Sequence, residues 1–179
     1  MEGAKHFQER NYEKALKSFQ YAEKKKPDDP LVLDYLSQVY AALNDLEKAT
    51  EYILRAMTLE PDSSVHKQLY ATYLMRQGKN EDAIFVIDEV LETQPVGILY
   101  VLRGQADFNL ENFESAISYF DKALEVDPKN PLANHMKGIL LYKLQKYTDA
   151  IPYLEEAMSF GEVESLKVIL EDCRVKSSE

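Results

Sequence analysis

One residue type recurs along this chain at a nearly constant interval. Five alanines are separated by 34, 34, 33 and 34 residues: Ala15, Ala49, Ala83, Ala116 and Ala150. Four prolines keep the same rhythm, at intervals of 34, 34 and 33 residues: Pro27, Pro61, Pro95 and Pro128. A period of this length is typical of a stack of similar supersecondary units, so the fold of the chain follows from the fold of one unit. It also moves the search for function from catalytic motifs to the surface of the stack.

Each alanine lies within a repeated pattern of small and large side chains. In the fourth unit a small residue, Gly104, precedes Ala116 by twelve positions, and the large Phe120 and the small Ala123 follow it. Small residues on both sides of a short polar break let two helices approach closely, while the large residue fills the space beside them. Each proline is expected to end the second helix, because proline has no N–H and disfavours helical angles in the residue before it. The pattern predicts a helix–turn–helix unit, repeated about five times.

These residues resemble the signature of the tetratricopeptide repeat family. Three units carry it most fully, in the sets Tyr12, Ala15, Phe19, Ala22, Pro27; Leu46, Ala49, Ile53, Ala56, Pro61; and Phe113, Ala116, Phe120, Ala123, Pro128. The chain departs from the family pattern in having no Trp, in Asn80 where an aromatic is usual, and in Glu162 where proline is usual. The resemblance implies an all-α, right-handed superhelical solenoid of about five tetratricopeptide repeats, the first of them truncated, followed by a capping helix.

The period also sets the expected boundaries within a single domain over 1–179. The repeats are expected at 1–29, 30–63, 64–96, 97–130 and 131–161, with the capping helix at 162–175. Met1 falls inside the first helix, so we expect either a fragment of a longer protein or a frayed first helix. Beyond Gly161, an apolar stripe at helical spacing predicts the cap that a solenoid needs: Leu166, Ile169, Leu170 and Cys173.

Composition excludes some classes of partner. The formal net charge of −10 argues against nucleic-acid binding, which needs a basic face. No apolar run approaches the roughly 18 residues of a membrane span and no signal peptide is visible, so no membrane insertion is expected. The single cysteine cannot form an internal disulfide, which fits a reducing compartment and a cytoplasmic location.

Catalytic chemistry finds no support in the sequence. His6, His66 and His135 lie in three different repeats without a second ligand at metal spacing, and no phosphate-binding glycine loop is present. We therefore expect no enzyme, no catalytic residue, no cofactor and no metal. Arg103 and Asp107 stand four residues apart where the family usually has apolar residues. They fit an internal ion pair or a polar anchor at the groove edge, and we favour the ion pair.

The resemblance implies a concave groove lined by the first helix of each repeat. The predicted peptide-binding residues are Gln38, Val65, Gln68, Thr72, Met75, Ile98, Val101, Gln105, Phe108, Asn109, Leu132, His135, Ile139 and Tyr142. Three glutamines in this set could bond the main chain of a peptide, and the apolar members could hold its side chains. Each aromatic member fits either groove exposure or packing on the neighbouring repeat. The basic and asparagine residues with which family members clamp chaperone tails are absent, so heat-shock-protein tails are not expected partners.

Three functions can be weighed on this basis. The first is a scaffold or adaptor that binds a peptide or helical segment of a protein partner, with an acidic chaperone for secreted proteins as a subclass. The alternative is a self-assembling repeat module, a homo-oligomer formed through the N-terminal end, with function carried by missing upstream segments. An enzyme is the third, and no motif supports it. We favour the scaffold.

Overall fold

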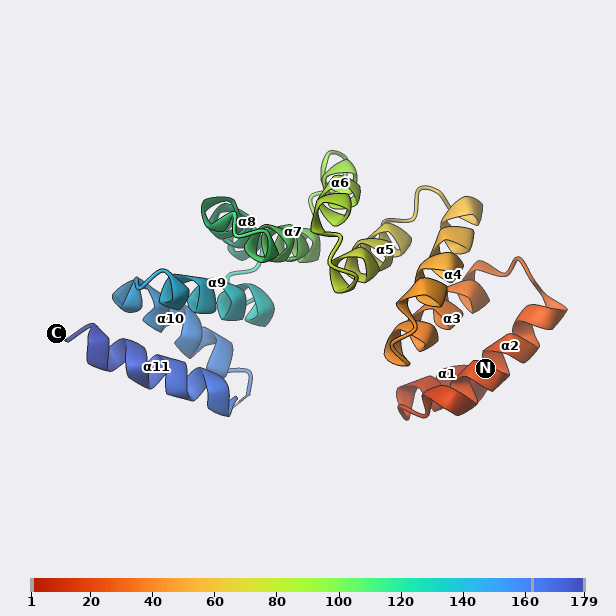
Figure 1. The fold of residues 1–179 in the computed structure, drawn as a ribbon, viewed down its shortest axis with the longest axis horizontal. Coiled ribbons are helices and arrows are strands. Elements are labelled where there is room, and N and C mark those ends of the chain that lie inside the picture. Colours follow the sequence, from red (N-terminus) through yellow and green to blue (C-terminus); the bar gives the residue numbers. More distant parts are fainter. Residues whose placement is uncertain (1, 162, 179) are drawn as a thin grey trace. The chain divides into compact units, whose positions relative to one another are not determined.

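Every regular element in the described part of the chain is an α-helix (Figure 1). The structure is a computed structural model and describes residues 2–161 and 163–178. Its helices are α1 (Glu2–Gln8), α2 (Tyr12–Lys25), α3 (Pro30–Ala42), α4 (Leu46–Leu59), α5 (Ser64–Arg76), α6 (Asn80–Leu91), α7 (Gly97–Asn109), α8 (Phe113–Val126), α9 (Pro131–Lys143), α10 (Tyr147–Met158) and α11 (Glu164–Lys176). The predicted all-α class is confirmed.

The helices fall into two compact units, which are described separately. Unit 1 runs to Val90 and unit 2 begins at Leu91, the last residue of α6. Within the units, α1 packs on α2, α3 on α4, α7 on α8 and α9 on α10. The first helices of the second to fifth repeats begin at residues 30, 64, 97 and 131, as the sequence period predicts. A single domain over the whole chain stays a prediction.

One residue in the turn of each repeat has a left-handed backbone. These residues keep the period of the sequence: Arg10 (φ 57°), Asn44 (φ 64°), Gly78 (φ 77°), Glu111 (φ 61°) and Gln145 (φ 61°). In the second repeat, the amide of Asp45 then donates to the carbonyl of Tyr40 at 2.9 Å, and the other turns have the same bond. This is the Schellman arrangement, which satisfies carbonyls at a helix end. The sequence pattern marked these positions only as polar breaks, because four of the five are not glycine.

The prolines end three of the second helices as expected. The residues before Pro27, Pro61 and Pro128 have φ values of −141°, −131° and −141°, outside the helical region. In the third repeat the expectation is wrong, because α6 ends at Leu91, four residues before Pro95.

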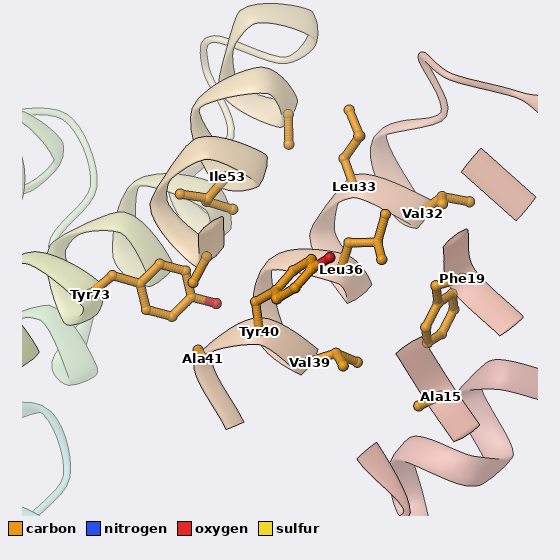
Figure 2. Close-up of a cluster of buried hydrophobic side chains, with 12 residues drawn as sticks. Ala15, Phe19, Val32, Leu33, Leu36, Val39, Tyr40, Ala41, Ile53 and Tyr73 are labelled. Atoms are coloured by element: carbon orange, nitrogen blue, oxygen red, sulfur yellow. The ribbon is translucent and has the colours of Figure 1, made fainter. Parts of the chain in front are cut away.

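The core of unit 1 is built from large side chains of successive helices (Figure 2). Phe19 from α2, Leu36 from α3 and Ile53 from α4 are fully or almost fully buried. Tyr73 from α5 joins the same cluster, and its hydroxyl lies 3.2 Å from the Ser37 Oγ. The helices are therefore held together mainly by apolar burial, and polar contacts such as this one and the hydrogen bond from Gln77 to Thr50 also link the second and third repeats.

In unit 2, small residues allow close helix contact as the sequence pattern predicts. A Cβ added at Gly104 would lie 2.7 Å from the Phe120 ring, and one added at Gly138 would lie 2.8 Å from Leu154. Both distances are too short for van der Waals contact, so α7 meets α8 and α9 meets α10 only because these positions lack a side chain. In α11, three members of the predicted apolar stripe are buried against α10: Leu166, Leu170 and Cys173. The capping helix is thus confirmed.

Candidate functional site

In unit 1, the first helices present five of the predicted binding residues. Gln38 lies on α3, and Val65, Gln68, Thr72 and Met75 lie on α5. Val65 is 59% exposed, and the other four are half-buried. The Thr72 hydroxyl donates to the carbonyl of Gln68 at 2.9 Å, so its proton is used within α5. This face therefore offers one exposed apolar side chain and two glutamine amides.

An acidic residue on the same face is absent from the predicted set. Asp34 lies one helical turn before Gln38, and burial raises the pKa of its carboxyl, although a hydrogen bond from Gln38 opposes this shift. Its Oδ1 is enclosed and has no hydrogen-bond donor in the described residues. The buried His66 ring has an unbonded Nδ1, 3.9 Å from the Glu60 Oε2. Unit 1 therefore has polar groups behind this face whose burial is incompletely compensated.

In unit 2, the structure places one predicted residue away from the surface. Val101 is fully buried and belongs to a core cluster with Phe120 of α8 and Ala133 of α9. Its place in that cluster, made by three successive helices, leaves no surface for a peptide to contact. The prediction that Val101 lines a groove is therefore wrong. Among the other predicted binding residues of unit 2, Asn109 is exposed, and three are half-buried: Ile98, Gln105 and Ile139.

The two aromatic members of the set pack within unit 2. The Phe108 ring lies 6.0 Å from the ring of Phe113 and 5.3 Å from the Lys143 Nζ. The Tyr142 hydroxyl donates to the Asp172 carboxylate on α11 at 2.7 Å, and this hydrogen bond raises the pKa of the phenol. Both side chains are half-buried. These contacts favour the packing interpretation for both aromatics.

Two predicted residues, Leu132 and His135, line a mainly apolar pocket in unit 2. It has a volume of about 310 Å³ between the start of α9, the end of α10 and the start of α11. Its other lining residues are Pro131, Ala157, Phe160, Gly161, Val163 and Leu166. Leu132 is 38% exposed and Phe160 is 55% exposed, so the rim is accessible and apolar. Such a pocket can hold an apolar side chain, with the His135 imidazole as a polar contact.

The pair Arg103 and Asp107 forms an internal ion pair in α7. The Arg103 guanidinium donates to the Asp107 carboxylate, which is 2% exposed and also accepts from the Ser115 hydroxyl at 2.6 Å. The guanidinium carbon lies 4.6 Å from the centre of the Tyr119 ring. The favoured interpretation of this pair, structural rather than ligand-binding, agrees with its burial.

A second buried cation was missed by the sequence analysis. Lys137 takes the place in α9 that Arg103 takes in α7, and its ammonium bonds Asp121 and, at 2.7 Å, the Tyr153 hydroxyl. Burial acts to lower the pKa of Lys137, but the hydrogen bonds to these two groups outweigh it and raise the pKa. The recurrence of a basic residue thirteen positions before the repeated alanine was the available signal.

The described residues include no group of three His, Cys, Asp or Glu side chains placed to hold a metal ion. Cys173 is buried, and burial raises the pKa of its thiol, which disfavours the nucleophilic thiolate. No described helix is both long and apolar enough to cross a membrane.

The sequence of this chain is similar to those of known repeat proteins. Models described as tetratricopeptide repeat match residues 6–73, 70–131 and 101–159. Tetratricopeptide repeat protein 21A of Mus musculus is 27% identical over 87% of this chain, and protein 13 of Homo sapiens is 26% identical over 82%. The chain spans only 12% and 18% of the length of these two relatives.

Solved structures show the same fold. PilW, described as a widely conserved type IV pilus biogenesis factor, has a TM-score of 0.88 at 19% identity, over 98% of this chain and 83% of its own. A thermophilic tetratricopeptide protein of Thermus thermophilus has a TM-score of 0.78 at 20% identity, over 97% of this chain and 95% of its own. At such low sequence identity, the similarity shows a shared fold and no shared function. The family matches, together with the periodic helix pairs, show that the chain belongs to the tetratricopeptide repeat family.

Proposed function

We propose that this chain is a protein-interaction scaffold that captures a peptide or helical segment of a partner on the first-helix faces of its repeats. The pocket at Leu132 and His135 is the observation that carries the proposal, because it joins two predicted binding residues to an exposed apolar rim. An apolar side chain of the partner would fill this pocket, and His135 would bond its main chain. Membership of a family of repeat scaffolds supports the proposal by analogy.

The proposal assigns recognition and no catalysis to these 179 residues. It also places the scaffold in the cytoplasm, because its single cysteine has no partner for an internal disulfide, which fits a reducing compartment. A protein with a surface of this kind acts by holding a partner, so its activity is measured as capture.

The test is affinity capture with the full chain and two matched variants. Leu132→Glu places a charge at the pocket rim and should abolish capture without unfolding α9, because the wild-type side chain is already partly exposed. Val175→Glu introduces the same charge at an exposed position of α11 outside the pocket, and should leave capture intact. Far-UV circular dichroism checks that both variants keep their helicity. Equal capture by Leu132→Glu and the wild type would refute the pocket as the binding site.

A further inference from the structure

The outer face of α2 carries a row of lysines in an otherwise acidic protein. Residues 14–26 contain five lysines and one glutamate, whereas the whole chain has a net charge of −10. At 3.6 residues per turn, Lys14, Lys17, Tyr21, Lys24 and Lys25 fall within about 100° of the helix circumference. All five side chains are exposed, while the opposite face of α2 packs into the core through Ala15 and Phe19. We call these five residues the α2 stripe.

The lysines of the α2 stripe have no carboxylate partner among the described residues, unlike most cations around them. In unit 1, Lys48 pairs with Asp45 at 3.0 Å, and Lys67 pairs with Glu89 at 2.6 Å. The only glutamate within residues 14–26, Glu23, bonds Arg55 at 2.7 Å and the Tyr52 hydroxyl at 3.1 Å. No described carboxylate within ion-pair distance therefore offsets the positive charge of the stripe. Its one internal contact is the Lys25 ammonium, 4.5 Å from the centre of the Tyr21 ring.

Helix stability does not account for the α2 stripe. Cations suit the C-terminal end of a helix dipole, which explains Lys24 and Lys25. Lys14 lies in the first turn of α2, where a positive charge opposes the dipole, and Lys17 lies one turn further and repels Lys14. Lys14 thus acts against the helix that carries it.

The repeat fold does not account for the α2 stripe either. The equivalent positions of α6, two periods further on, include Asp82, Phe85 and Glu89. Those of α4, one period further on, include two cations, Lys48 and Arg55, but both are paired with carboxylates, and Glu51 lies between them. Among these three helices, a row of lysines without carboxylate partners in the described residues is therefore specific to α2. It lies on the second helix of the pair rather than on the first-helix face of the proposed groove.

We propose that the α2 stripe is a docking surface for an acidic segment of a protein partner, separate from the groove. Unpaired lysines complement glutamate and aspartate side chains, and the exposed Tyr21 gives the row an aromatic contact of the kind enriched in interface centres. A membrane surface fits less well, because stable binding there takes an apolar contact in addition to basic residues, and the apolar face of α2 is buried in the core. Nucleic acid carries a denser negative charge, which the acidic remainder of the chain repels.

The probe is a short fluorescein-labelled peptide of alternating glutamate and alanine, measured by anisotropy with the full chain. We expect binding in dilute buffer that weakens strongly between about 20 mM and about 300 mM salt, because exposed charges are screened. The double variant Lys17→Glu, Lys24→Glu should lose affinity by at least about tenfold. Its matched control is Lys129→Glu, Lys167→Glu, which makes the same change in net charge at exposed lysines of unit 2 and should bind like the wild type.

Several outcomes would overturn the proposal. One is no peptide binding at low salt, and another is an equal loss in both double variants, which would reflect total charge alone. Stripe-dependent binding to phosphatidylserine vesicles or to oligothymidine, without binding to the peptide, would assign the surface to a different partner. Salt-dependent self-association that blocks the peptide, seen by sedimentation, would make a second copy of the chain the occupant. All substituted side chains are exposed, so loss of folding is not expected to confuse these results.

Discussion

Unit 1 and unit 2 are built from the same repeat, but they differ in how side chains cap the backbone N–H groups at the N-termini of their helices. In unit 1 a side chain accepts a hydrogen bond at the N-terminus of α2, α3, α4 and α5: Asn11, Asp29, Asp45 and Ser63. Among the described residues of unit 2, Asn130 caps α9 in this way, while no side-chain cap is found for α7, α8, α10 and α11. A cap contributes about 1 kcal/mol, so the helices of unit 2 depend more on tertiary packing for their stability.

The buried side chains differ at equivalent places as well. In unit 1, the ring of Tyr40 stacks on Tyr52 with centres 5.4 Å apart. In unit 2, Asp107 occupies the place of Tyr40 and pairs with Arg103 beside Tyr119. The same place in the repeat therefore accepts either an aromatic stack or a buried ion pair, provided that the buried charges are matched.

The largest effect is expected from breaking the ion pair of unit 2. Asp107→Ala removes the buried carboxylate that accepts from Arg103 and Ser115, and should lower the free energy of unfolding by about 3–5 kcal/mol, because breaking a buried ion pair is strongly destabilising. Urea unfolding followed by far-UV circular dichroism measures this loss. The apolar double variant Arg103→Leu, Asp107→Leu restores the side chains usual in the family and should be near neutral. A loss below about 1 kcal/mol for Asp107→Ala would show that the ion pair is not needed.

The next effect concerns the close helix contact in unit 2. Gly104→Ala introduces a Cβ 2.7 Å from the Phe120 ring and 3.1 Å from the Ala116 carbonyl oxygen, so it should destabilise the protein by about 1–3 kcal/mol. Gly161→Ala is the control, because a Cβ there meets nothing within 4 Å. The same unfolding measurement applies. Equal stability of the two variants would mean that α7 and α8 can separate without cost.

A smaller effect should follow from removing a helix cap in unit 1 or adding one in unit 2. Asn11→Ala removes the cap of α2 and should cost about 1 kcal/mol. Lys146→Asn supplies a cap to α10 and should add a similar amount, because the two positions share backbone angles near φ −88°, ψ 72° and φ −87°, ψ 64°. Thermal unfolding of both variants tests whether α10 lacks a stabilising cap that α2 has. Destabilisation by Lys146→Asn would contradict this difference between the units.

The smallest expected effects are on the pH dependence of stability, with opposite signs in the two units. Burial raises the pKa of Asp34, so its native form binds a proton more tightly than the unfolded chain, and stability from this group increases as pH falls towards its unfolded pKa. Hydrogen bonds from Lys176 and Tyr142 lower the pKa of Asp172, so its contribution is present above the unfolded pKa and lost as pH falls through the folded value. Unfolding midpoints of Asp34→Asn and Asp172→Asn, measured from about pH 3 to pH 7, should deviate from the wild type in opposite directions. Deviations of the same sign would contradict these assignments.

The sequence predicted the features that depend on local spacing. The period located the first helices, the apolar stripe located α11, and the four-residue spacing paired Arg103 with Asp107. Each of these follows from residues that lie close together in one helix or recur at one interval.

Features set by contacts between helices were harder to predict. The partner of Lys137 is Asp121, sixteen residues earlier on another helix, and no motif joins them. Val101 carries the family's groove position, yet packing with α8 and α9 covers it completely. Of the pocket in unit 2, the sequence predicted Leu132 and His135 as binding residues. It did not predict Phe160 and Val163, because these come from the end of one repeat and the start of the cap.

The most direct test of the proposed scaffold is hydrogen exchange of the full chain, alone and with the partner obtained by capture. We expect new protection in residues 132–139 and 163–170, which contribute to the pocket of unit 2, and little change in the second helices of unit 1. The Leu132→Glu variant should show no such protection. Protection confined to residues outside the pocket and the first helices would contradict the proposed scaffold.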